Sequence, residues 1–349
     1  MRAFFTCISA VDPNFRSQHI LKVKPMTLSR RKLLRGSAAS LALAVAGPAR
    51  AQAWPIKPVT LVVPQAPGGS SDILGRTIAE RLSPRLGQPV IVENRVGAGG
   101  NIGTGQVANA TPDGHTLVLG YVGTMAINPS LYASVPFDPV NSFTNIVGLA
   151  DVPLVLVVRA DFPAKTLDEL VALARSKQLT FGSAGNGTMN HMAGELLNQH
   201  AKLKITHIPY RGVAASVTDV AGGTVDMAFA SAPSIVGHVK GGRLRAIAVT
   251  SPARSKALPE VPTMMESKTG AISVSTWYSI IGPKGLPAAV VTRIHNEVLK
   301  IYEAPEMRER LDSLGAVPWT LGPDQLLATI KEDIARWTPI VKATGAKID

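Results

Sequence analysis

The residues of this 349-residue chain that are best suited to chemistry form a loop that could bind an anion. Residues 60–72 read Thr-Leu-Val-Val-Pro-Gln-Ala-Pro-Gly-Gly-Ser-Ser-Asp, which is typical of a buried strand, a glycine loop and a helix start. Gly68 and Gly69 let the backbone turn closely around a ligand, and Ser70–Asp72 suit the first turn of a helix. A helix N-terminus beyond the carboxyl end of a strand binds anions through its backbone N–H groups. The loop therefore predicts an anion site, but not which anion, nor whether catalysis follows binding.

A second glycine loop follows the predicted strand Val90–Val92. Gly97, Gly100 and Gly103 match a Gly-x-x-Gly-x-x-Gly nucleotide fingerprint. Glu93–Arg95 make this loop longer than the tight turn of a dinucleotide site, so the match is weak. A nucleotide-dependent enzyme is one interpretation, and a loop that shapes a cleft and stabilises a carboxylate is the other.

A third loop, residues 181–188, reads Phe-Gly-Ser-Ala-Gly-Asn-Gly-Thr between a predicted strand and a predicted helix. Ser183 does not form a nucleophile elbow, because Phe181 stands where that motif requires glycine. A secreted serine hydrolase that pairs Ser183 with His191 is the alternative to a binding loop. Hydrogen bonding to a ligand by Ser183 and Thr188 is the interpretation that the sequence favours.

Neither metal ligands nor paired catalytic acids stand out in the chain. The histidines never occur at the spacing of a zinc-binding helix, and Asp72, Asp113 and Asp226 give no pair at a catalytic spacing. Cys7 is the only cysteine and lies in a predicted leader. We therefore expect no metal and no cofactor, while the choice between a serine hydrolase and a non-catalytic binding loop at Ser183 stays open.

The N-terminus predicts export. Residues 29–35 are rich in Arg and Lys, residues 36–47 form a short apolar stretch, and Pro48-Ala-Arg-Ala51 resembles a cleavage site. Arg30-Arg31 favours the twin-arginine route, with an ordinary Sec signal as the alternative. We predict that residues 1–51 are an N-terminal extension and signal peptide, cleaved near Ala51 on the way to the periplasm.

The predicted leader also changes the charge of the protein. The whole chain carries 36 basic and 24 acidic residues, a net charge of +12, but nine basic residues and one acid precede residue 52. The remaining chain has no basic tract of the kind that binds nucleic acid. We therefore expect no nucleic-acid partner.

Strand-like and helix-like segments alternate after the leader, which indicates an α/β fold. The almost wholly apolar segment Leu154–Val158 predicts a strand of a parallel sheet that is covered on both faces. Leu74, Ile78, Leu82 and Leu86 predict one apolar face of the first helix, and the pattern Thr166-Leu-Asp-Glu169 predicts a capping box. We expect residues 52–152 and 277–349 to form one lobe and residues 153–276 to form the other, with a cleft between them.

The chain resembles the solute receptors of tripartite tricarboxylate transporters, the Bug family of periplasmic binding proteins. The resemblance covers residues 54–345, and it rests on motifs in the family's order and spacing. These motifs are residues 63–72, 92–103, 111–117, 126–132, 181–188, 207–212, 222–226, 248–251 and 258–263.

The resemblance implies a two-lobed periplasmic binding protein fold of type II, with a double crossover and a hinged cleft. It implies a monomer that binds a small carboxylate and delivers it to the membrane permease of a tripartite tricarboxylate transporter, without catalysis. A sensor without a transport role is an alternative within the family. The ligand-binding residues it implies are Gly68, Gly69, Asp72, Thr124, Ser183, Asn186, Thr188, Tyr210 and Asp226.

Two positions depart from the family's usual pattern. Gln65 stands where an aromatic residue is common, and Ala230 stands where many relatives carry aspartate. Because an acid at position 230 would suit an amino group, Ala230 disfavours amino acids as ligands.

Overall fold

The computed structural model describes residues 54–269, 272–344, 347 and 348. The predicted signal peptide and its cleavage near Ala51 lie outside these residues. Within the part of the chain that is described, no helix combines the length and the apolar character needed to cross a membrane.

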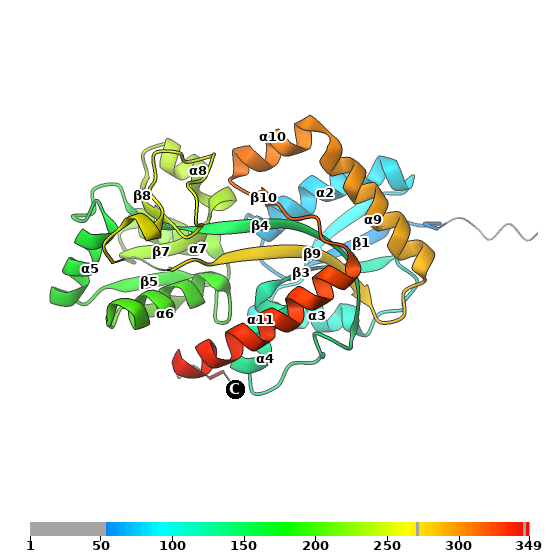
Figure 1. Ribbon diagram of the computed structural model, residues 1–349, viewed down its shortest axis with the longest axis horizontal. Coiled ribbons are helices and arrows are strands. Elements are labelled where there is room, and N and C mark those ends of the chain that lie inside the picture. Colours follow the sequence, from blue (N-terminus) through cyan, green and yellow to red (C-terminus); the bar gives the residue numbers. More distant parts are fainter. Residues whose placement is uncertain (1–53, 270–271, 345–346, 349) are drawn as a thin grey trace, which may run out of the picture. The chain divides into compact units, whose positions relative to one another are not determined.

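Ten strands form one mixed sheet in the order β2-β1-β3-β9-β4-β7-β5-β6, with β8 and β10 also paired to β4 (Figure 1). We call β1, β2, β3, β9 and the first part of β4 the first lobe, and β5 to β8 with the last part of β4 the second lobe. The strands of the first lobe are β1 (Val59–Val63), β2 (Val90–Asn94), β3 (Thr116–Tyr121), β4 (Phe143–Arg159), β9 (Ser275–Pro283) and the short β10 (Val317–Pro318). Those of the second lobe are β5 (Thr180–Ser183), β6 (Thr206–Pro209), β7 (Met227–Ser231) and β8 (Leu244–Val249).

The 17-residue strand β4 joins the two lobes. From Phe143 to Pro153 it pairs with β9, and from Leu154 to Arg159 it pairs with β7 and β8. Figure 1 shows β4 and β9 side by side between the lobes. The lobe boundaries expected at residues 152/153 and 276/277 stay a prediction.

Most helices follow the carboxyl end of a strand. In the first lobe these are α2 (Ser70–Leu86), η1 (Ala98–Gly100), α3 (Asn101–Ala108), η2 (Gly123–Ile127) and α4 (Asn128–Leu131). In the second lobe they are α5 (Leu167–Ser176), α6 (Met189–Ala201), α7 (Val213–Gly222), α8 (Ala232–Lys240) and η3 (Met264–Glu266). The last helices are α9 (Ala288–Glu303), α10 (Pro305–Leu314) and α11 (Pro323–Thr344); α9 packs on α2 and β4, and α11 on η2, α4 and β4.

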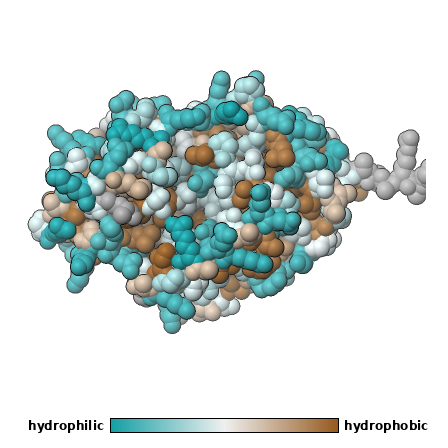
Figure 2. Space-filling view, in the orientation of Figure 1, coloured by the Kyte–Doolittle hydropathy of each residue, from teal (hydrophilic) through white to brown (hydrophobic). Residues whose placement is uncertain are grey.

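The predicted packing of the first helix is confirmed. Leu74, Ile78, Leu82 and Leu86 of α2 are all buried, so their shared face is part of the core. Thr166 caps α5 by accepting a hydrogen bond from the Glu169 N–H (3.2 Å), which confirms one half of the predicted capping box. The Glu169 carboxylate accepts from the Lys165 N–H (2.7 Å) and not from that of Thr166. Figure 2 shows hydrophilic residues over much of the visible surface, with smaller apolar patches between them.

The parallel sheet predicted around residues 154–158 is wrong. These residues belong to β4, which runs antiparallel to β7, β8 and β9. A continuous apolar run indicates that both faces of a strand are covered, and Leu154–Val158 are indeed buried. Such a run does not indicate whether the neighbouring strands are parallel or antiparallel.

Candidate functional site

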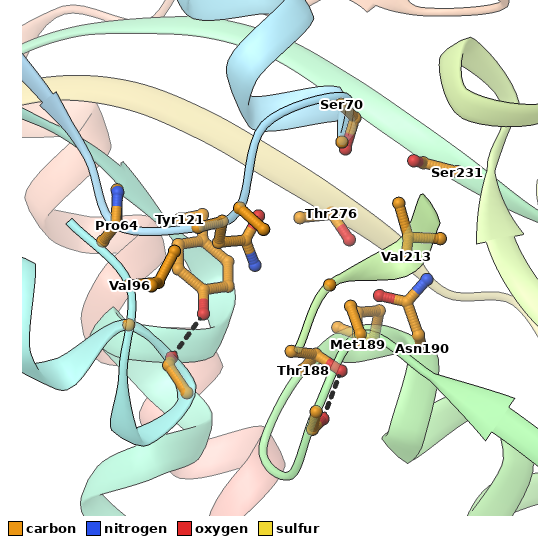
Figure 3. Close-up of a pocket in the computed structure, with 18 of the residues that line it drawn as sticks. Pro64, Ser70, Val96, Tyr121, Thr188, Met189, Asn190, Val213, Ser231 and Thr276 are labelled. Carbon is orange, nitrogen blue, oxygen red and sulfur yellow. Dashed lines mark hydrogen bonds between the residues drawn. The ribbon is translucent and has the colours of Figure 1, made fainter. Parts of the chain in front are cut away.

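A cavity of about 470 Å³ lies between the two lobes (Figure 3). This volume is in the range of small-molecule sites. The first lobe lines it with Pro64–Ala66, Gly69, Ser70, Val96–Gly100 and Tyr121, and the second lobe with Ala184, Gly185, Thr188–Asn190, Tyr210–Val213 and Ser231. Leu154, Thr276 and Tyr278, on the strands that join the lobes, complete the wall.

Helix N-termini surround this cavity. Lining residues stand at the start of α2 (Ser70), α6 (Met189), α7 (Val213) and α8 (Ser231). Each of these helices follows the carboxyl end of a strand, so their positive dipole ends and unpaired N–H groups collect at one place. Such an arrangement attracts anions.

Asp72 shapes the loop between β1 and α2. Its Oδ2 accepts a hydrogen bond from the Gly68 N–H (3.0 Å), and its Oδ1 accepts from Arg76 Nε and Asn94 Nδ2 (3.0 Å each). Asn94 Nδ2 also donates to the Gln65 carbonyl (3.0 Å), which ties the loop to β2. Burial works against the charge, but the bonds from Arg76, Gly68 and Asn94 outweigh it and hold the pKa of Asp72 below its ordinary value. The carboxylate is thus used within its own loop and does not line the cavity.

Hydroxyl groups fix the start of α2. The Ser70 and Tyr278 hydroxyls hydrogen-bond to each other, which links α2 to β9. Ser71 Oγ donates to Gln65 Oε1 (2.6 Å), so the Gln65 side chain is held beside the helix start. Tyr121 donates to the Gly99 carbonyl (2.6 Å) (Figure 3). Burial raises the pKa of both tyrosines, so they stay neutral.

The loop between β5 and α6 is held by its own polar side chains. Thr188 caps α6 by accepting from the His191 N–H (3.4 Å), and its Oγ1 donates to the Gly185 carbonyl (2.6 Å). Ser183 is fully buried; its Oγ accepts from the Gly185 N–H (3.1 Å) and lies 2.7 Å from His207 Nε2. Asn190 Nδ2 donates to the Phe229 carbonyl (2.8 Å), and its oxygen points into the cavity (Figure 3).

The two lobes touch where the η1 and α4 segments meet the β5–α6 loop. Tyr132 donates to the Asn186 carbonyl (3.4 Å). A Cβ added to Gly99 would lie 2.7 Å from the Asn186 carbonyl oxygen, and a Cβ added to Gly187 would lie 2.1 Å from Asn128 Oδ1. Glycine is therefore needed at both positions for the lobes to approach this closely.

The predicted site residues are divided between the cavity and its surroundings. Gly69, Thr188 and Tyr210 line the cavity, whereas Gly68, Asp72, Thr124, Ser183, Asn186 and Asp226 are not among its lining residues. The ligand-binding roles given to these nine residues stay predictions.

Three of the predicted site residues, Thr124 and Asp226 outside the cavity wall and Tyr210 within it, have hydrogen-bond partners inside the protein. Thr124 is buried, and its hydroxyl donates to the Tyr121 carbonyl (3.3 Å). Asp226 precedes β7 and therefore stands at the amino end of that strand, away from the cavity, where it accepts from the Thr180 N–H (2.9 Å) and hydroxyl (3.1 Å). Tyr210 lines the cavity, but its hydroxyl donates to Asp219 Oδ2 (2.7 Å); burial and that bond raise its pKa to about 12.

Several lining residues were not predicted from the sequence, notably Arg211, Asn190, Ser231 and Thr276. Arg211 is the one charged side chain among the described residues that line the cavity, and no acid lines it. It is exposed and has no hydrogen-bond or ion-pair partner within the described chain. Its place directly after Tyr210, at the end of a predicted strand, was the sequence signal that could have identified it.

The geometry gives little support to nucleotide binding, serine hydrolysis or metal binding. Gly97–Gly100 form part of the wall of the same cavity, as a loop that shapes the cleft would. Ser183 pairs with His207 rather than His191, and within the described residues no acid hydrogen-bonds to His207. In residues 54–269, 272–344, 347 and 348, no group of three His, Cys, Asp or Glu side chains could hold a metal ion.

Comparisons with known proteins agree with this geometry. The model of the tripartite tricarboxylate transporter family receptor matches residues 74–346. Protein BugT from Bordetella pertussis is 34% identical over 307 residues, which cover 87% of this chain and 94% of BugT.

Two solved structures are similar over their whole length. One, from R. palustris with adipate, is 32% identical with a TM-score of 0.82 and covers 84% of this chain and 100% of the other. MatC from Rhodopseudomonas palustris with bound malate is 31% identical with a TM-score of 0.78, covering 82% and 100%.

Proposed function

Because this chain belongs to the tripartite tricarboxylate transporter family of receptors, which includes the Bug proteins, we propose that it binds a small organic carboxylate in the periplasm. It delivers this ligand, as a monomer, to the membrane permease of a tripartite tricarboxylate transporter. Export by the predicted leader places it in that compartment.

One observation carries the proposal: the N-termini of α2, α6, α7 and α8 converge on a cavity whose described lining residues include one cationic side chain and no acid. Backbone donors and dipoles bind a carboxylate with little reorganisation, since the loops that carry them are already held by Asp72, Ser183 and Thr188. A neutral or cationic ligand would gain nothing from these dipoles.

The ligand class can be narrowed to a dicarboxylate. The similar structures named above hold adipate and malate, and each of these acids has a carboxylate at either end. In this chain one carboxylate would meet the helix N-termini, and the unpaired Arg211 would meet the second. The absence of an acid among the described lining residues leaves the amino group of an amino acid without an anionic partner, which supports the expectation from Ala230.

Calorimetric titration of the purified protein tests the proposal. Malate, adipate, citrate, butyrate, aspartate and glucose form a suitable panel, and we expect heat from at least one di- or tricarboxylate and none from glucose. Ligand at 100 times its dissociation constant should also stabilise the fold by about 2.7 kcal/mol. Binding of glucose without any carboxylate would refute the proposal, and tight binding of aspartate would refute the exclusion of amino acids as ligands.

The serine hydrolase alternative makes a different prediction. Ser183 is fully buried and is not part of the cavity wall, so a substrate in the cavity does not reach its hydroxyl. We therefore expect p-nitrophenyl acetate to be hydrolysed at the rate of buffer alone, by the natural protein and by Ser183→Ala. Turnover that is abolished by this substitution would favour the hydrolase.

A further inference from the structure

The β5–α6 loop rests on two histidines on the side that faces away from the cavity. His207 Nε2 lies 2.7 Å from Ser183 Oγ, which in turn accepts from the Gly185 N–H (3.1 Å). His191 Nδ1 accepts from the Gly187 N–H (3.4 Å). Both imidazoles therefore act on the backbone of a loop whose other side lines the cavity at Gly185.

The two imidazoles cannot easily turn away from the loop, because they belong to a stack of three rings. The Phe181 and His207 ring centroids lie 4.8 Å apart with planes at 28°, and those of His207 and His191 lie 4.0 Å apart at 19°. His191 is 5% exposed. The stack fixes each ring plane, and the contacts with Ser183 and Gly187 select which ring nitrogen faces the loop.

The geometry also fixes the protonation of His191. Its Nδ1 can accept from Gly187 only without a proton, so the proton of the neutral ring is on Nε2, which lies 3.7 Å from Glu195 Oε1. Burial lowers the pKa of His207 to about 4 and, together with His207, lowers that of His191 to about 3. Glu195 on α6 faces His191, and β5 and β7, which pack on α6, have no charged residue.

We propose that His191 and His207 are positioning residues of the carboxylate site: through their ring nitrogens they hold the β5–α6 loop in the shape that presents Gly185 and Thr188 to the ligand. This inference rests on the proposed function, since the ligand is the carboxylate proposed above. Neither histidine lines the cavity, so each acts through the loop and not by contact with the ligand.

Paired substitutions separate hydrogen bonding from packing. At position 207, His207→Gln keeps a polar atom near the place of Nε2, whereas His207→Met removes it. At position 191, His191→Asn keeps an acceptor near the place of Nδ1, whereas His191→Leu removes it. In calorimetric titrations with malate and adipate, we expect the Met and Leu variants to lose about tenfold or more in affinity and the Gln and Asn variants to stay within about threefold. His200→Gln, an exposed histidine on the same helix, is the matched control and should bind as the natural protein does.

Each possible result decides the inference. Equal losses for the polar and apolar member of each pair would mean that the rings only fill space, and natural affinity in all four variants would mean that the loop does not need them. Either result overturns the proposal. If the natural protein binds neither malate nor adipate, the titrations use the carboxylate of the panel that does bind. If no carboxylate binds, the proposed function fails, and amide exchange then tests the role of the histidines in the loop separately. Protection of the Gly185 and Gly187 amides should fall about tenfold in the Met and Leu variants and persist in the others; unchanged protection overturns the inference.

If the apolar variants do not fold, a nitrogen NMR spectrum of the natural protein tests the inference instead. Ring nitrogen shifts should show His191 neutral at pH 5.5, with its proton on Nε2. A charged ring, or a proton on Nδ1, at that pH would overturn the inference.

Discussion

Asp72 Oδ2 accepts a hydrogen bond of 3.0 Å from the backbone N–H of Gly68, four residues earlier in the same loop. Gly68 has a φ of +80°, a conformation that favours glycine, so the turn depends on both residues. An acid near the N-terminus of a helix would repel an anionic ligand if it lay in the cavity. Here the Asp72 carboxylate is directed into the loop and neutralised by Arg76. It therefore organises the anion site without repelling the ligand.

Substitution of Asp72 tests this arrangement. Asp72→Ala removes the acceptor of the Gly68 N–H and one acceptor each of Arg76 and Asn94. We expect a loss of roughly 1–3 kcal/mol in the free energy of unfolding together with weaker carboxylate binding. Because the folded-state pKa of Asp72 lies below 3.8, its contribution is present above that pH and is lost as the pH falls through the folded value. Urea unfolding and titration with malate measure both effects. Asp324→Ala, an exposed acid in the first turn of α11, is the control; equal effects of the two substitutions would contradict the role of Asp72.

Gly187→Ala should hold the two lobes apart. The new methyl group would lie 2.1 Å from Asn128 Oδ1 and 2.9 Å from Leu131 Cδ2, both in the first lobe. Gly242→Ala is a matched control, because Gly242 has a similar φ (+67° against +75°) but nothing within 4 Å of the added methyl. We expect each substitution to cost roughly 1–2 kcal/mol in backbone strain, while Gly187→Ala alone loses about tenfold or more in carboxylate affinity. Equal affinities of the two variants would show that this contact between the lobes does not support binding.

Arg211→Gln should change ligand preference more than overall binding. If the guanidinium meets the second carboxylate, its removal weakens malate and adipate binding by roughly 1–3 kcal/mol and leaves butyrate binding nearly unchanged. Arg243→Gln, which removes an exposed cation elsewhere in the second lobe, should affect neither. Parallel calorimetric titrations of the three proteins provide the comparison. An equal loss for malate and butyrate would assign Arg211 to general attraction of anions instead.

The sequence predicts this fold best where the periodicity is local. The apolar face of α2 and the cap of α5 depend on residues within a few positions of one another, and both predictions are confirmed. The first part of β4 was not predicted, because register shifts at Asn145/Val147 and Gly148/Ala150 break the alternation of buried and exposed residues. The sequence of a single strand also does not show whether its neighbours are parallel or antiparallel, which is why Leu154–Val158 was assigned to a parallel sheet.

The candidate site was predictable at the level of its loops and less so at the level of side chains. The glycine loops at residues 64–69 and 184–188 are the segments that meet at the cavity. Which side of such a loop a side chain occupies depends on partners that are distant in sequence. Ser183 is directed to His207, 24 residues later, and Asp226 to Thr180, 46 residues earlier. Resemblance to a family names such residues, but the structure is needed to separate those that line the cavity from those that hold the lining in place.

Acid should destabilise the protein through the pair formed by the buried His191 and the half-buried His207. Histidine has a pKa of about 6.5 when unfolded, and burial lowers it in the fold to about 4 for His207 and about 3 for His191. Between these values the unfolded chain binds more protons than the native protein, so stability falls as the pH falls from about 6.5 to about 4. Each histidine adds at most about 1.4 kcal/mol per pH unit to this slope.

Urea unfolding at pH 7, 5.5 and 4.5 measures this slope. The double variant His191→Asn/His207→Gln should show a shallower slope than the natural protein, because neither new side chain titrates. His200→Gln should leave the slope unchanged, since this histidine is exposed and is not part of the ring stack. The difference between the natural protein and the double variant isolates the pair from the carboxylates, which also titrate at acid pH. Identical slopes in these two proteins would mean that the pair is not held neutral by the fold.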